Sequence, residues 1–124
     1  MIRHSTIVTT ARLTLGVIFF VFGLNGFFGF LPQPALPSEA AAFLGALGAT
    51  GYMLPLIKGT EVVAGLMLLA NRWVPLALLL LAPIVVNIVA FHVVLAPANP
   101  VTAVVLGLTV FLAWSYRRHY RELF

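Results

Sequence analysis

The chain has 124 residues, of which 62% are hydrophobic and only 8% are charged, and its mean hydropathy is +1.11. Soluble domains carry about 25% charged residues, so this chain has too little polar surface to cover a water-facing globule. The net charge of +4 does not indicate nucleic-acid binding, because the basic residues cluster at the chain ends and one turn, and the lack of cysteine excludes disulfides and thiolate-held metals.

The sequence predicts four membrane-spanning helices in a single domain, residues 1–124. The expected spans are residues 7–30, 52–70, 74–95 and 101–116. The first is too long for the apolar core of a typical signal peptide, and no A-x-A cleavage site follows it. Three segments separate the spans: a stretch at 31–37 that contains three prolines, a tight turn at 71–73 and a short turn at 97–100. Glycines 16, 23, 26 and 29 should let the first span approach a neighbouring helix closely.

A short helix is expected between the first two spans. Ser38 can cap it, Glu39 suits its positive N-terminal end, and residues 40–50 continue it. About a dozen residues cannot cross a bilayer, so we expect an interfacial or re-entrant helix. The predicted fold class is therefore an all-α membrane protein, a bundle of four transmembrane helices with one short extra helix.

The arginines predict the orientation of the chain. With four spans, both termini and the turn at 71–73 lie on one side, which holds Arg3, Arg12, Arg72, Arg117, Arg118 and Arg121. The opposite loops carry no lysine or arginine outside the spans, so the positive-inside rule places both termini in the cytoplasm. We expect Arg12, Arg72 and Arg117 at the cytoplasmic interface, Arg12 by extending its side chain to it. The alternative for Arg12 is binding an acidic partner or a lipid headgroup.

Lys58 and Glu61 are the most informative residues, because the span at 52–70 is otherwise uncharged. Three residues apart, they share one face of a helix. A salt-bridged pair costs less to bury than either charge alone, so the pair is first interpreted as a structural contact that fixes helix packing. In the alternative, Glu61 is a proton acceptor or a ligand anchor.

Asn25, Asn87 and His92 fall in the same outer half of the bilayer as Lys58 and Glu61. Hydrocarbon offers polar groups no partners, so we expect all five to converge on one internal cavity between the first three spans, roofed by the short helix. His92 could instead be a structural histidine, bonded to Asn87 or to a backbone carbonyl. These side chains are too poor a set for zinc, and we assign neither a metal site nor a catalytic residue.

Several motifs are similar to those of a known family. They are Ala-Arg-Leu at residues 11–13, Glu61 with Gly65, Asn87 with Phe91-His92, and residues 114–117. On these motifs, and over nearly its whole length, the chain resembles the DoxX family of small four-helix proteins. The resemblance implies a multi-pass protein of the bacterial cytoplasmic (inner) membrane. The family name derives from a thiosulfate:quinone oxidoreductase subunit, so the resemblance also suggests a quinone.

Two functions fit these features. The small size and the absence of a soluble domain and of cysteine favour a non-catalytic accessory or assembly subunit. Its partners would be membrane lipid and other membrane proteins or further copies of the chain. The alternative is a redox-linked component that binds a quinone or a small apolar ligand, with His92, Asn87 and Glu61 hydrogen-bonding its carbonyl. No resident cofactor is assigned beyond that quinone. A transporter fits least, because the chain has no inverted repeat.

Overall fold

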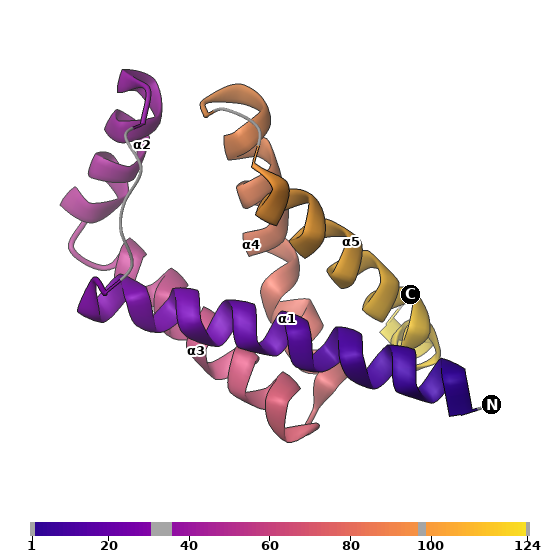
Figure 1. Cartoon of the computed structure of the whole chain (residues 1–124). Coiled ribbons are helices and arrows are strands. Elements are labelled where there is room, and N and C mark those ends of the chain that lie inside the picture. Colours follow the sequence, from indigo (N-terminus) through magenta and orange to yellow (C-terminus); the bar gives the residue numbers. More distant parts are fainter. Residues whose placement is uncertain (1, 31–35, 97–98, 124) are drawn as a thin grey trace.

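The computed structural model describes residues 2–30, 36–96 and 99–123, and these residues are almost entirely helical. The elements are α1 (Ile2–Phe28), α2 (Ser38–Ala49), α3 (Met53–Ala70), α4 (Val74–Val94), α5 (Pro100–Ser115) and the 3₁₀ helix η1 (Arg117–Leu123) (Figure 1). Pro32, Pro34 and Pro97, which the sequence places in turns, lie outside the described residues.

Three helices contain stretches that are long and apolar enough to cross a membrane. These are Thr6–Phe28, Met53–Ala70 and Val74–Val94. The fourth apolar helix, α5, has 16 residues, a length of about 24 Å at 1.5 Å per residue, against a hydrocarbon layer of about 30 Å. Large apolar side chains such as Val86, Val93 and Val110 are exposed on the outer faces, which is typical of helices surrounded by lipid. The chain is an all-α membrane protein.

The helix boundaries follow from local chemistry. α1 ends at Phe28, and Gly29 then adopts a left-handed conformation with a φ of 63°, as glycine commonly does after a helix. Ser38 does not cap α2, contrary to the sequence prediction. Pro37 occupies the cap position in an extended conformation, and the Ser38 hydroxyl donates instead to the Glu39 carboxylate at 2.6 Å. Ser38 is already helical, so its oxygen cannot reach the free N–H groups of the first turn.

The four longer helices share one hydrophobic core. Each contributes one fully buried leucine: Leu15, Leu68, Leu81 and Leu112. In α3 no residue before Glu61 is buried, and in α4 none after Val85 is. α3 and α4 are therefore tightly packed in the half of the molecule near the turn that joins them and loosely packed in the other half.

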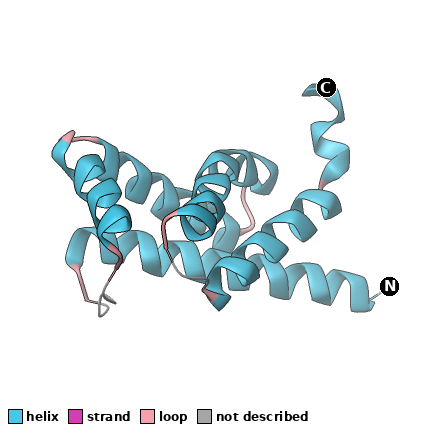
Figure 2. Ribbon diagram, turned by 90° about the horizontal axis from the view of Figure 1, so that it is seen from above, coloured by secondary structure: helices cyan, strands magenta, loops and turns pink. Residues whose placement is uncertain are grey.

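The arrangement of the helices explains this difference. α4 crosses the α1–α3 pair instead of running alongside it, so the helices fan apart, and α2 stands at the open end (Figure 1). Seen from above, α2 again lies at the end of the molecule away from the two termini (Figure 2). The expected bundle is thus closed around its core at one end only.

The C-terminal helix η1 packs back onto the start of α4. The Tyr120 hydroxyl donates a hydrogen bond to the Pro75 carbonyl oxygen at 2.9 Å. Burial, with a smaller contribution from Tyr116, raises the pKa of Tyr120, so this hydroxyl keeps its proton as a donor at neutral pH.

Candidate functional site

Glycines bring α1 and α3 into close contact beside the polar residues. A Cβ on Gly65 would lie 2.7 Å from the backbone nitrogen of Phe20, and one on Gly23 would lie 2.9 Å from the Lys58 carbonyl oxygen. A Cβ on Gly26 would overlap Cγ of Lys58. The glycines therefore set the distance between the two helices, and Gly26 makes room for the aliphatic stem of Lys58.

Lys58 and Glu61 form the ion pair that their spacing predicts. Nζ of Lys58 lies 3.4 Å from Oε1 of Glu61. The two partners differ in burial, because 29% of the Lys58 side chain is exposed and only 5% of the Glu61 side chain. The carboxylate is thus enclosed by protein, whereas the lysine reaches accessible space.

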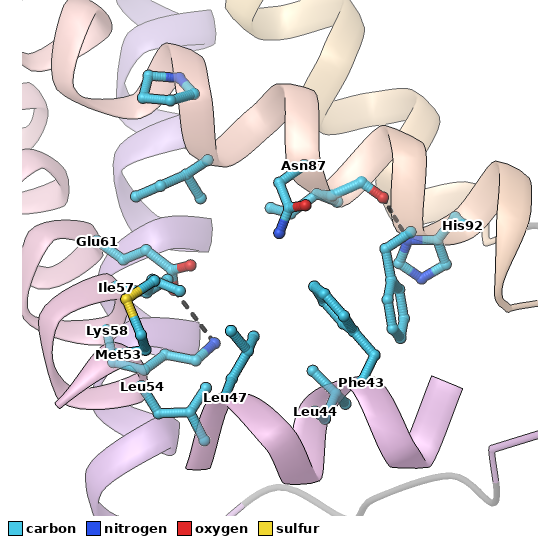
Figure 3. A pocket seen from close by; sticks show the side chains of 14 residues that line it. Phe43, Leu44, Leu47, Met53, Leu54, Ile57, Lys58, Glu61, Asn87 and His92 are labelled. Carbon is cyan, nitrogen blue, oxygen red and sulfur yellow. Dashed lines mark hydrogen bonds and ion pairs between the residues drawn. The ribbon is translucent and has the colours of Figure 1, made fainter. Parts of the chain in front are cut away.

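The pair faces a cavity of about 460 Å³ between α2, α3 and α4, which we call the lateral cavity. Lys58 and Glu61 project into it from α3, Asn87 and His92 lie across from them on α4, and Phe43 and Leu47 of α2 line a third side (Figure 3). Its other lining residues are apolar: Leu44, Met53, Leu54, Ile57, Pro83, Ile84, Ile88 and Phe91. Asn87 is exposed, so the lateral cavity is open at the surface.

A second cavity of about 260 Å³, which we call the inner cavity, lies between α1, α3, α4 and α5. Four residues line both cavities: Lys58, Glu61, Ile88 and His92. Its remaining lining residues are Ile18, Phe19, Phe22, Asn99, Val101, Thr102 and Val105. The ion pair and His92 thus stand in the wall that the two cavities share.

The His92 ring is held by two contacts of one nitrogen. Nδ1 lies 3.0 Å from the Ile88 carbonyl oxygen and 3.0 Å from the Thr102 hydroxyl (Figure 3 shows the first). A carbonyl oxygen only accepts, so in the tautomer with its proton on Nδ1 the ring donates to Ile88, whereas in the other tautomer Nδ1 accepts from the Thr102 hydroxyl. Nε2 is an acceptor in the first tautomer and a donor in the second, so it can form a hydrogen bond with a ligand in either.

Four of the five predicted polar residues come together, and one does not. Lys58, Glu61, Asn87 and His92 line the lateral cavity, and α2 forms one of its walls. Asn25, near the end of α1, lines neither cavity. Instead of the one predicted cavity between the first three spans there are two: the lateral cavity, to which α1 contributes no residue, and the inner cavity, where α1 lines the wall together with Lys58, Glu61 and His92.

Comparison with protein families matches residues 7–94 to DoxX. The chain belongs to the DoxX family. The comparisons with curated proteins and with solved structures find no match. The DoxX match includes all residues that line the lateral cavity, whereas the α5 residues of the inner cavity lie beyond it.

Arg12 of this DoxX protein is buried rather than extended toward an interface. Only 8% of it is exposed. Its guanidinium donates to the Leu68 carbonyl oxygen and, at 3.5 Å, to that of Leu69. Both carbonyls belong to the last turn of α3, where backbone acceptors lack helical partners and a cation is favoured. The sequence places Arg12 at the same end of the protein as the α3–α4 turn, as the structure does, but it does not predict the backbone carbonyls that Arg12 binds.

Arg12→Met should lower the free energy of unfolding by about 1.5–3 kcal/mol, the usual contribution of hydrogen bonds to a charged group. Unfolding in mixed micelles by increasing the fraction of SDS measures it. Arg12→Lys should recover part of the loss, because it restores the charge without the fork of donors. The neighbouring Leu13 is exposed, so Leu13→Met is the control. An equal effect of Arg12→Met and Leu13→Met would contradict this role.

Arg72 and Arg117 behave differently from Arg12. The Arg72 guanidinium lies 5.4 Å from the centre of the Trp73 ring, and that of Arg117 lies 4.2 Å from the Trp114 ring. All four side chains are exposed. Paired tryptophan and arginine side chains are typical of a membrane–water interface.

Sequence reasoning missed Thr102 and Phe43. Thr102 bonds His92 from α5, and the Phe43 ring lies 5.9 Å from that of Phe91, linking α2 to α4. The contact between His92 and Thr102 could have been predicted from their spacing, because each lies five residues from position 97. Antiparallel helices joined by a short turn place such residues at the same depth.

Proposed function

We propose that this DoxX protein is a non-catalytic membrane subunit that binds a lipid-soluble small molecule in the lateral cavity. The observation that carries this proposal is the composition of the cavity wall. Four polar side chains converge on about 460 Å³ of otherwise apolar space, and ligand sites typically have about 300–1,000 Å³ and just such a lining.

The side chains at the wall suit a flat ligand that carries carbonyl or hydroxyl groups. Lys58 and Asn87 can donate to a carbonyl oxygen, and Nε2 of His92 can accept from a hydroxyl. Phe43 and Phe91 supply aromatic surface. A quinone has this combination of a polar ring and an apolar tail, and it would reach the cavity from the lipid.

Filling the cavity should prevent ligand binding. Ile84 is a wall residue, whereas Val86 on the same helix is 68% exposed and lines neither cavity. We expect Ile84→Trp to abolish saturable binding of decylubiquinone to the purified protein in calorimetric titration, and Val86→Trp to leave it unchanged. Asn87→Leu should weaken binding about tenfold, the equivalent of one hydrogen bond. If the wild-type protein shows no saturable binding of this or a menaquinone analogue, the quinone assignment fails.

A groove on the lipid-facing surface of the protein supports the proposal that the chain is an accessory subunit. It measures about 370 Å³ and is lined by Thr6, Thr10 and Thr14 of α1 and by Leu108 and Phe111 of α5. Hydroxyl groups on a lipid-facing surface can hydrogen-bond a neighbouring transmembrane helix. Gentle purification followed by mass spectrometry identifies the lipid-soluble molecules and the proteins that remain bound.

We also propose four spans in a bacterial inner membrane, α5 being the fourth, with both termini in the cytoplasm. This rests on the one-sided arginines. A cysteine at Thr50, in the exposed α2–α3 turn, should react with an impermeant thiol reagent applied to intact spheroplasts. One at the exposed Arg121 should react only after lysis. Because the chain has no cysteine, the label is unambiguous, and reaction of both sites from outside would contradict the proposed topology.

A further inference from the structure

The Lys58–Glu61 pair has too few hydrogen bonds to be stable in a dry environment. The lysine ammonium has three donors, and among the described residues it donates to Glu61, at 3.4 Å. Charge-assisted hydrogen bonds are usually about 2.7–2.9 Å long. A buried pair recovers its cost of desolvation only when further hydrogen bonds satisfy the remaining donors and acceptors. Other polar groups or water must therefore reach this pair.

The inner cavity has the room and the polar wall to supply that water. Its volume of about 260 Å³ corresponds to about eight water molecules at roughly 30 Å³ each. Lys58, Glu61 and His92 lie at one part of its wall, and Thr102 and Asn99 continue the polar surface along α5. Asn99 is exposed and caps α5, where its side chain accepts from the Val101 backbone N–H at 2.9 Å. The polar surface thus runs from the ion pair to Asn99 at the start of α5.

The contact between His92 and Thr102 joins α4 to α5 beside this cavity. In the tautomer that directs the Nδ1 proton of His92 to the Ile88 carbonyl, the Thr102 hydroxyl proton is not needed by the ring and can be donated to a water molecule. A water in the cavity needs two to four polar partners, and this pair of side chains provides some of them midway along the polar wall.

We propose that the inner cavity is a water-filled vestibule that opens beside Asn99, at the start of α5, and hydrates the Lys58–Glu61 pair. The pair then stands between water in the inner cavity and the lipid-accessible lateral cavity. The vestibule does not depend on the lateral cavity holding a ligand, so it can be tested separately from the proposed function.

Cysteine accessibility tests the vestibule, with adjacent residues as matched controls. Val105 lines the inner cavity, whereas Val104 is 48% exposed and lines neither cavity; Ile18 and Val17, the latter 50% exposed, form a second such pair. Each single-cysteine variant is exposed to an anionic methanethiosulfonate and to Ag⁺ in open membrane fragments, which gives both reagents access to both faces. Thiols react as thiolates, which form in water and not in hydrocarbon.

We expect the thiols at positions 105 and 18 to react at least about tenfold faster than those at 104 and 17, because apolar surroundings suppress the thiolate. Thr102→Leu should slow the reaction at 105 and leave that at 104 unchanged. Fast reaction with Ag⁺ alone supports a narrow vestibule that still contains water. Equally slow reaction of both members of each pair with both reagents overturns the proposal. Should one variant fail to fold, the other pair still decides.

Discussion

Lys58→Met is expected to destabilise the protein by about 3–5 kcal/mol, the cost of leaving one member of a buried ion pair without its partner. Glu61→Gln should cost less. The reason is the difference in burial. Lys58→Met leaves Glu61, whose side chain is 5% exposed, without a partner, whereas Glu61→Gln leaves Lys58, whose side chain is 29% exposed, without one. The ammonium is therefore more accessible to water than the carboxylate, and its loss of a partner costs less. The free energy of unfolding in SDS-containing mixed micelles measures both.

The double variant Lys58→Met/Glu61→Gln separates the pair from its surroundings. It should be more stable than Lys58→Met alone, since neither charge is then left unpaired. Leu56→Met, at an exposed position of the same helix, controls for the introduced methionine. A double variant no more stable than Lys58→Met would mean that Glu61 has another partner.

The sequence was sufficient for the features that the membrane and the local helix geometry impose. Hydrocarbon favours long apolar helices, so the apolar helices, three of them long enough to cross a membrane, could be located from composition. The Lys58–Glu61 pair depends only on a three-residue spacing within α3. Both predictions are independent of how the helices pack against one another.

The shape of the site depends on that packing and was predicted only in part. Topology gives the depth of a residue and not the direction in which it faces. Asn25 lies on α1, which of the two cavities borders only the inner one and does so through Ile18, Phe19 and Phe22. The lateral cavity is open because α4 crosses the α1–α3 pair (Figure 1). The crossing follows from contacts between helices that no single span reveals.

Arg12 shows the same limit for a single side chain. Its position at the end of the protein followed from the sequence, but its burial did not. The last carbonyls of α3 are polar groups that residue-based hydropathy does not count, and they provide Arg12 with acceptors. Predicting this contact requires knowing that α3 packs against α1.

Gly65→Ala is expected to destabilise the protein by about 1–3 kcal/mol, as overpacking usually does. The added Cβ would lie 2.7 Å from the backbone nitrogen of Phe20 and 2.9 Å from the carbonyl oxygen of Gly16. Neither atom can move by a change of rotamer, so α1 and α3 must separate.

The other glycines of the two helices provide controls for this prediction. Gly59, also on α3, has no atom within 4 Å of a built Cβ, so Gly59→Ala should be neutral or slightly stabilising, because alanine favours a helix by about 1 kcal/mol over glycine. The three atoms nearest to a Cβ at Gly26 all belong to the flexible stem of Lys58, so Gly26→Ala should disturb the ion pair more than the contact between the two helices. If Gly65→Ala and Gly59→Ala have equal unfolding free energies, the glycine contact does not set the distance between α1 and α3.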